Sequence, residues 1–245
     1  MAKRRKQGGI LLHRLFLEPR QFPRIEDVPL AARHALVDVL LAESSIEQAS
    51  SVMATIDEPP EVSDKYMWHL RRARILVLGG QKQKGAVVLN DVLEKNTDLS
   101  REQLDRLLQV VFDLQTVGAH EEAYQLFNRV IAKNQDAKLT RELYYWMADS
   151  RKAQGQYQES ARLYLKSALH EQNGLDPWGQ TARYQAAEAL AKAKLVTDAR
   201  RLFMQLLATT KEPDRRAVLQ QQLQSLWTVD EQSENQEDTD EHPAN

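Results

Sequence analysis

The sequence predicts an all-α fold: an α-solenoid of about five helical hairpins, closed by a C-terminal capping helix. Only 9 of the 245 residues are glycine and 8 are proline, while long stretches are rich in residues with high helix propensity. Small residues also recur at intervals of 37, 37, 37 and 39 positions, at Ala49, Ala86, Ala123, Ser160 and Ala199. A fixed period of this length is typical of stacked repeats, in which each unit buries its apolar face against its neighbours.

An apolar stripe accompanies each of these small residues. Four positions later the chain carries Met53, Asn90, Phe127, Tyr164 and Phe203, and three positions further it carries Ile56, Leu93, Val130, Ser167 and Leu206. This spacing places all three residues of a unit on one helix face. The second helix of each hairpin is therefore expected to bury this face.

The hairpins follow one another in order along the chain. Residues 21–28 are expected to form a linker, and Pro29 fits the first turn of a helix that ends near Ala42. Ser44 and Glu47 predict a capping box at the start of its partner. The remaining paired helices are expected at 63–79 and 82–95, 100–117 and 120–133, 140–154 and 157–171, and 177–193 and 196–209.

Start and stop signals support these boundaries. Ser100 and Gln103 predict a second capping box, and Asp176 followed by Pro177 is a typical helix start. Glycines predict the turns within three of the hairpins, at Gly79–Gly80, Gly118 and Gly155. Gly79–Gly80 could also suggest phosphate binding, but a helix stop is the stronger interpretation.

The two ends differ from the middle of the chain. A helix from Pro213 to about Trp227 places Leu219, Leu223 and Leu226 on one face, as expected of a terminal cap. Residues 228–245 hold seven carboxylates and no Lys or Arg, which predicts a disordered acidic tail. Residues 1–28 are expected to be basic and irregular, so the predicted solenoid covers residues 29–227.

The repeat resembles the tetratricopeptide repeat (TPR), a helix–turn–helix module of 34 residues. The fourth unit carries the resemblance best, with Tyr144, Met147, Ala148, Gly155, Tyr157, Ser160, Tyr164 and Ser167. Asn90 departs from the pattern, because a large apolar residue is expected there, and Lys194 replaces a turn glycine. The fourth unit also looks like the TPR modules of bacterial envelope-assembly proteins.

Enzyme motifs are absent from the sequence. There is no Walker loop, dinucleotide fingerprint, His-Glu-x-x-His or Gly-x-Ser-x-Gly motif, so no catalysis and no cofactor are expected. His34 and Asp38 are four residues apart and could supply half a metal site, but no third ligand is visible. A solvated helix-surface pair is the favoured interpretation, and no metal is expected.

The resemblance implies a scaffold that binds a protein or peptide partner in a concave groove lined by the first helix of each hairpin. Aromatic side chains would anchor such a ligand and charged ones would set its register. For each aromatic residue, filling the space between repeats is an equally good interpretation. The family's groove-facing positions fall here on His34, Asp38, Trp68, Arg71, Arg72, Gln109, Phe112, Tyr145, Asp149, Lys152, Tyr184 and Glu188.

Several partner classes can be compared with this pattern. The Lys, Asn and Arg clamp that TPR domains use to grip chaperone C-termini is not reproduced, and the paired polar readers of RNA-binding repeats are not found, so nucleic acid is not expected in the groove. The acidic tail is one candidate groove ligand. An alternative function is a peripheral tether to an anionic membrane or nucleic acid through Lys3–Lys6.

No segment approaches the length of a membrane span, and no export signal is recognised. A cytoplasmic location is therefore expected, or the cell envelope if the chain belongs to a longer anchored protein. The sequence does not identify the partner, the pathway or the oligomeric state.

Overall fold

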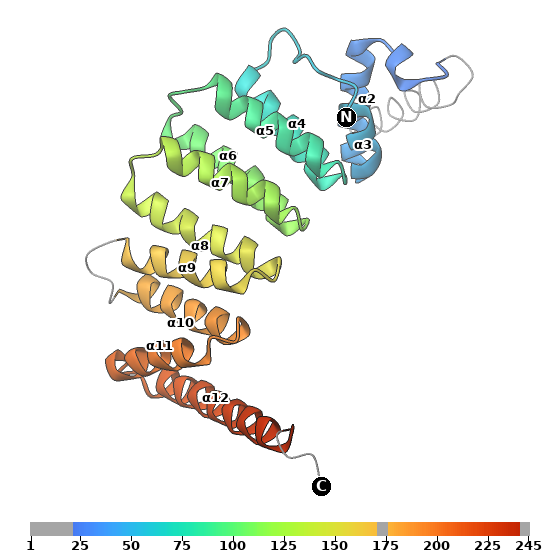
Figure 1. Ribbon diagram of the computed structural model, residues 1–245. Coiled ribbons are helices and arrows are strands. Elements are labelled where there is room, and N and C mark those ends of the chain that lie inside the picture. The colour runs from blue at the N-terminus through green and yellow to red at the C-terminus, as the bar shows by residue number, and fades with distance from the viewer. Residues whose placement is uncertain (1–21, 171–175, 241–245) are drawn as a thin grey trace. The chain divides into compact units, whose positions relative to one another are not determined.

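The computed structural model describes residues 22–170 and 176–240, with side chains up to residue 226. All regular structure in these ranges is helical, which confirms the predicted all-α fold (Figure 1). The elements are η1 (Ile25–Asp27), α2 (Leu30–Ala42), α3 (Ile46–Met53), α4 (Lys65–Leu78), α5 (Lys82–Lys95), α6 (Arg101–Thr116), α7 (His120–Lys133), α8 (Ala137–Ala153), α9 (Tyr157–Leu169), α10 (Pro177–Lys192), α11 (Val196–Thr209) and α12 (Pro213–Asp240).

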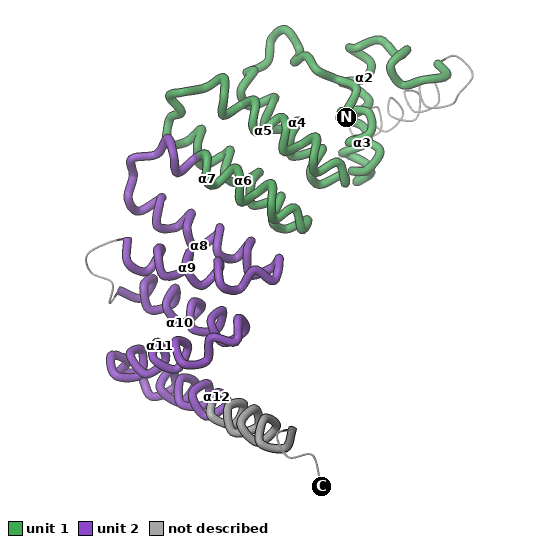
Figure 2. The backbone as a smooth tube through the Cα atoms, in the orientation of Figure 1, with its two compact units in different colours: residues 1–129 green, residues 130–245 purple. Residues whose placement is uncertain are grey.

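The helices form five hairpins, α2–α3, α4–α5, α6–α7, α8–α9 and α10–α11, followed by α12. The chain divides into two compact units, residues 1–129 and residues 130–245 (Figure 2). Within the first unit α3 packs on α4, and α4 packs on α6. Within the second unit α9 packs on α10, and α11 packs on α12.

One turn geometry joins the two helices of every hairpin. In each turn a single residue has a left-handed backbone, and the next residue donates its N–H to a carbonyl five positions earlier, at 2.8–2.9 Å. This bond is typical of the Schellman motif, which satisfies the free carbonyls at a helix end. The left-handed residues are Ser44 (φ 60°), Gly80 (89°), Gly118 (75°), Gly155 (76°) and Lys194 (61°).

The turn residues correct two predictions. The capping box of Ser44 and Glu47 is wrong, because Ser44 is the left-handed residue and Ser45, the N-cap, makes no side-chain capping bond. The repeat register also moves by one residue in the second hairpin, α4–α5. In four hairpins, the residue five positions after the left-handed one is small and begins the buried stripe: Ala49, Ala123, Ser160 and Ala199. In the α4–α5 hairpin, the same count reaches Gly85 and not Ala86.

The corrected register removes the apparent anomaly at Asn90. Four positions after the small residue, the five hairpins carry Met53, Leu89, Phe127, Tyr164 and Phe203, and all five side chains are buried. Asn90 lies beside this stripe, where it donates to the Ala86 carbonyl at 3.0 Å and accepts from Arg129 at 2.5 Å. The buried stripe is therefore complete in every one of these hairpins.

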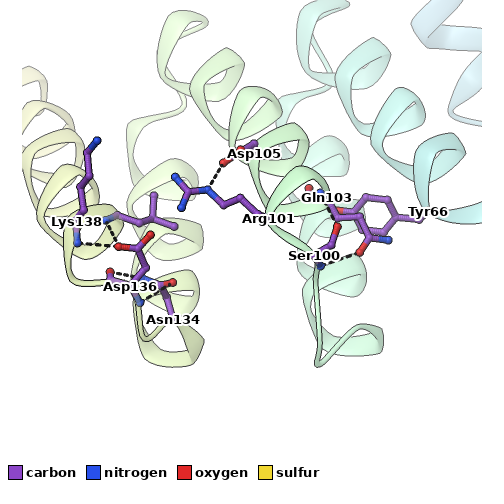
Figure 3. A network of polar contacts seen from close by, with 9 residues as sticks. Tyr66, Ser100, Arg101, Gln103, Asp105, Asn134, Asp136 and Lys138 are labelled. Atoms are coloured by element: carbon purple, nitrogen blue, oxygen red, sulfur yellow. Dashed lines mark hydrogen bonds and ion pairs between the residues drawn. The ribbon is translucent and has the colours of Figure 1, made fainter.

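The first helices begin at polar caps. The predicted box of Ser100 and Gln103 is confirmed, since both of its hydrogen bonds are present (Figure 3). The α8 helix begins three residues earlier than predicted, because Asp136 accepts the N–H groups of Lys138 and Leu139 at 2.9 and 3.2 Å. Tyr66 of α4 donates to the Gln103 carbonyl of α6 at 2.6 Å and so ties two successive first helices.

A buried arginine joins three helices of the second unit. Arg141 of α8 forks onto the Asp176 carboxylate at 2.5 and 2.6 Å and donates to the Ser167 carbonyl of α9 at 3.1 Å. Trp178 of α10 donates to the Ser167 hydroxyl at 3.0 Å. Asp176 also caps α10 by accepting from the Gly179 N–H at 2.8 Å.

The last helix, α12, extends past its predicted end near Trp227 and reaches Asp240. Residues 228–240 contain neither glycine nor proline, so no residue in this stretch breaks the helix. The disorder expected of residues 228–245 stays a prediction, and residues 241–245 lie outside the described part of the chain. Within that part, no helix is both long and apolar enough to cross a bilayer.

Candidate partner-binding site

In the first unit, the predicted groove residues lie on α2, α4 and α6. Trp68 is only 5% exposed, and its ring lies 6.0 Å from that of His34 and 5.0 Å from that of His69, in edge-to-face contacts. The Arg72 guanidinium lies 5.9 Å from the Trp68 ring centroid. Trp68 therefore fills the space between helices, and this structure does not present its face to a ligand.

The arginines predicted to receive a ligand carboxylate already contact carboxylates of this chain. Arg71 of α4 pairs with Asp38 of α2, and Arg72 pairs with Asp57 at 2.5 Å. A third pair, Arg74 with Asp113 of α6 at 3.0 Å, links the next two first helices. A ligand carboxylate would have to displace one of these internal partners.

Burial dominates the electrostatics of the Arg74 pair. Desolvation raises the pKa of Asp113, while the Arg74 guanidinium lowers it. The other predicted residues of α6 differ in exposure. Gln109 is exposed, whereas Phe112 is half-buried with its ring 5.4 Å from that of Phe127 in the neighbouring α7.

In the second unit, the structure brings the predicted residues of α8 together with those of α10. The Tyr145 ring lies 5.1 Å from that of Tyr164 and 5.2 Å from that of Trp178, so this tyrosine is largely surrounded by aromatic rings. Asp149 accepts a hydrogen bond from the Tyr164 hydroxyl. Burial, reinforced by that bond to Asp149, raises the pKa of Tyr164 well above its usual range.

Lys152 connects the two first helices of this unit. Its ammonium lies 3.6 Å from the Glu188 carboxylate and donates to the Gln185 side-chain oxygen at 2.6 Å. Tyr184, one turn before Glu188, packs its ring 5.7 Å from that of Phe203 on α11. Burial raises the pKa of Tyr184, and the Glu188 carboxylate adds to this effect.

Beyond Tyr184, the helices α10, α11 and α12 enclose a pocket of about 330 Å³. We call this cavity the α10–α12 pocket; it is lined by Gln180, Thr181, Tyr184, Leu206, Thr210, Asp214, Arg215, Val218 and Leu219. Leu219 and Leu206 are buried, whereas Val218 is 45% exposed and lies where solvent reaches the lining. Arg215 donates to the Gln180 side-chain oxygen at 3.4 Å across the two helices.

Of the predicted groove residues, only Tyr184 lines this pocket. The sequence predicts that α12 is a cap whose buried face includes Leu219, and this residue is indeed buried. Val218 was missed, although one signal was present: it is an apolar residue beside the predicted buried face rather than on it. Its exposure of 45% leaves part of the apolar lining of the pocket in contact with solvent.

The possible half metal site on α2 does not gain further ligands. His34 contacts the Trp68 ring and Asp38 pairs with Arg71. Throughout residues 22–170 and 176–226, no three His, Asp or Glu side chains lie together as a metal would require. Gly79 and Gly80 end α4, as the helix-stop interpretation predicts.

Three structural features decide the fold type: paired helices, a shared left-handed turn and a small buried residue that opens each second helix. The chain has a TPR-like helical-repeat fold. No family model matches this chain, and no curated protein matches it. Its similarity to known proteins therefore comes from solved structures alone.

Those solved structures are themselves described as TPR repeat proteins. A putative kinesin light chain with nearly identical TPR-like repeats, from Podosopora anserina, is 17% identical to the TPR-like chain, with a TM-score of 0.46 over 76% of this chain and 96% of that one. The C-terminal part of a TPR repeat-containing protein from Cytophaga hutchinsonii is 11% identical, with a TM-score of 0.38 over 91% of this chain and 90% of that one.

Proposed function

We propose that this chain is a non-catalytic scaffold that binds a segment of a protein partner in the α10–α12 pocket. The observation that carries the proposal is the pocket itself, which has buried leucines at its base and a partly exposed Val218 beside them. An apolar side chain of a ligand would cover this surface and gain the free energy of leaving water.

The polar groups around the pocket favour an extended peptide over a small apolar molecule. Gln180 and Thr181 of α10 face Asp214 and Arg215 of α12 across the opening, so hydrogen-bond donors and acceptors line both sides. A peptide backbone offers matching groups at regular intervals. The anchor would thus enter the pocket while the backbone bonds to the rim.

The neighbouring surface of α8 and α10 would extend the contact. Lys152 and Glu188 are each about one quarter exposed, so both remain accessible beside Tyr184 while they pair with each other. A ligand charge that replaces one partner would displace the other, which is partly exposed and can turn to water. This arrangement can select the register of a ligand without requiring a net charge on it.

Substitution of Val218 tests the proposal. The full chain would be used to select binders from a displayed library of random peptides, and the recovered peptides would be titrated against variants. Val218→Asp should weaken binding strongly, because it places a charge in the apolar pocket. Met204→Asp is the matched control, since Met204 on α11 is 50% exposed and lies outside the pocket lining.

Recovery of peptides with a common apolar residue, whose binding falls only in Val218→Asp, is the expected result. Equal loss in the two variants would indicate a general effect of added charge and would contradict the proposed pocket. Failure of the library to give any binder would contradict peptide recognition as a whole. Circular dichroism of both variants would show that the helices remain formed.

A further inference from the structure

A second surface of the α8–α9 hairpin gathers basic side chains. We call it the basic patch and define it by Arg162, Lys166 and His170 at the end of α9, together with Tyr144 of α8. Spacing by four places the three basic residues on one face of α9. The Lys166 ammonium lies 5.4 Å from the Tyr144 ring centroid, and the His170 ring lies 5.8 Å from it.

The basic patch has little internal compensation. Among the described residues, the one ion pair found here joins Arg162 to Glu159 at 3.9 Å, and Glu159 also contacts Arg151 at 3.4 Å. Lys166 and His170 form no ion pair within the described part of the chain. This distinguishes Lys166 and His170 from Arg71, Arg72 and Arg74, each of which contacts an aspartate.

Apolar surface lies directly beside these charges. Leu165 and Leu169 line the same shallow depression of about 430 Å³, and Leu169 is 64% exposed. A large exposed leucine next to exposed cations is complementary to an acidic segment that also carries an apolar side chain. The tail of this chain supplies the opposite charge, with seven carboxylates between Asp230 and Glu241 and a single aliphatic side chain, Val229, directly before them.

The direction of α12 keeps a tail away from the basic patch of its own copy. In Figure 1, α9 ends at the left edge of the second unit, whereas α12 starts near that edge and runs toward the lower right. The C-terminal direction of α12 therefore points away from His170, and a tail could reach the patch of its own copy only if α12 melted. A second copy meets no such restriction.

We propose that the acidic segment 228–241 of one copy binds the basic patch of a second copy. The two surfaces differ, so the contact is heterologous and leaves a free patch at one end and a free tail at the other. Chains or rings larger than a dimer follow from this geometry. Because the ion pairs are exposed, the association is weak and depends strongly on salt.

The first test is the mass of the full-length protein, measured by sedimentation or light scattering from micromolar to sub-millimolar concentration at low salt. The average mass should rise with concentration past that of a dimer, and it should return to that of a monomer near 1 M salt, where the Debye length falls to about 3 Å. The double variant Arg162→Glu/Lys166→Glu should weaken association by roughly tenfold or more, since two favourable charge pairs become repulsive.

The matched control is Arg201→Glu/Lys211→Glu, which changes the net charge equally at exposed positions away from the patch. A second variant carries Asn or Gln at all seven carboxylates of the tail. Neither the neutral-tail variant nor the patch variant should associate with itself. Mixed together, they should form a one-to-one complex, because one retains an intact patch and the other an intact tail.

Complex formation in the mixture tests the contact between tail and patch even if one variant is less stable, because circular dichroism reports the folding of each variant independently. A wild-type chain that stays monomeric throughout would overturn the proposal. Association that the patch variant and the control variant reduce equally would also overturn it. A mixture of the two variants that remains monomeric would do the same.

Discussion

The adjacent glycines at the end of α4 differ in the physical reason for their lack of a side chain. Gly80 has a φ of 89° and no atom within 4 Å of the place where a Cβ would lie. Gly79 has an ordinary φ of −89°, but its Cβ would overlap Ser50 Cβ and lie 2.7 Å from the Ile46 carbonyl oxygen of α3. Gly80 is thus required by conformation and Gly79 by the close approach of two helices.

These two causes predict different costs for an alanine. At Gly80, a left-handed alanine costs about 1–2 kcal/mol, partly offset by about 0.4–1 kcal/mol from the stiffer unfolded chain, so a net loss near 1 kcal/mol is expected. At Gly79, the obstacle includes a backbone oxygen that moves only with the whole of α3. Overpacking of this kind typically costs about 1–3 kcal/mol, so Gly79→Ala should be the more damaging change.

Urea unfolding of the two variants measures the difference, and Ser50→Gly identifies its cause. Removal of Ser50 Cβ should recover part of the loss in Gly79→Ala, with a coupling free energy of about 0.5 kcal/mol or more. The same change should add independently to Gly80→Ala, which touches nothing. Equal losses in the two alanine variants, or a Ser50→Gly change that rescues both or neither, would refute the steric explanation.

Five further substitutions test the turns, the register and the buried arginine. Lys194→Gly should stabilise the chain by about 0.5–1 kcal/mol because it relieves a left-handed lysine, whereas Gly155→Ala should destabilise it by about 1 kcal/mol. Thermal unfolding would measure both changes, and a loss of stability in Lys194→Gly would contradict the turn geometry. Leu89→Ala should cost about 2–5 kcal/mol and Asn90→Ala about 1 kcal/mol, and the reverse order would restore the uncorrected repeat register. The hydrogen bond from Arg141 lowers the pKa of Asp176, so this pair stabilises the fold above the ordinary aspartate pKa of about 3.9, and the contribution is lost as the pH falls further. Asp176→Asn should therefore flatten the acid limb of a pH–stability profile. An unchanged acid limb would exclude the pair as its source.

The sequence predicts most of the helical hairpins because the repeat period and the turn glycines are local signals. Gly118 and Gly155 mark their turns correctly, since left-handed backbone is easiest for glycine. Ser44 and Lys194 adopt the same conformation without any such signal. Their turns are held by the hydrogen bonds and packing of the flanking helices, which a local pattern does not contain.

The one-residue register error has a similar origin. Two small residues, Gly85 and Ala86, stand side by side, so equal spacing alone selects the wrong one. The structure identifies Gly85 by its close approach to α4, since Val77 Cγ2 lies 2.5 Å from the place that a Cβ would occupy. Only the distance between α4 and α5 makes glycine necessary there.

The candidate site was harder to predict than the fold. Sequence spacing finds which residues share a helix face, but it does not show which charges are already paired across repeats. Asp38 and Arg71 are 33 positions apart, and Lys152 and Glu188 are 36 apart, so each pair is visible only once the helices are packed. The burial of Trp68 is hidden for the same reason.

The pairing of charges provides a way to separate the two proposed interactions by salt. A ligand anchored in the α10–α12 pocket gains most from apolar burial, and the nearby Lys152 is already paired with Glu188. Its affinity should therefore change little between low and high salt. Association through the basic patch depends on exposed cations and should be lost over the same range. Salt titration of peptide binding and of average mass, in one protein sample, should give opposite results. A pocket ligand that dissociates together with the oligomer would show that charge, rather than Val218 and its neighbours, accounts for its binding.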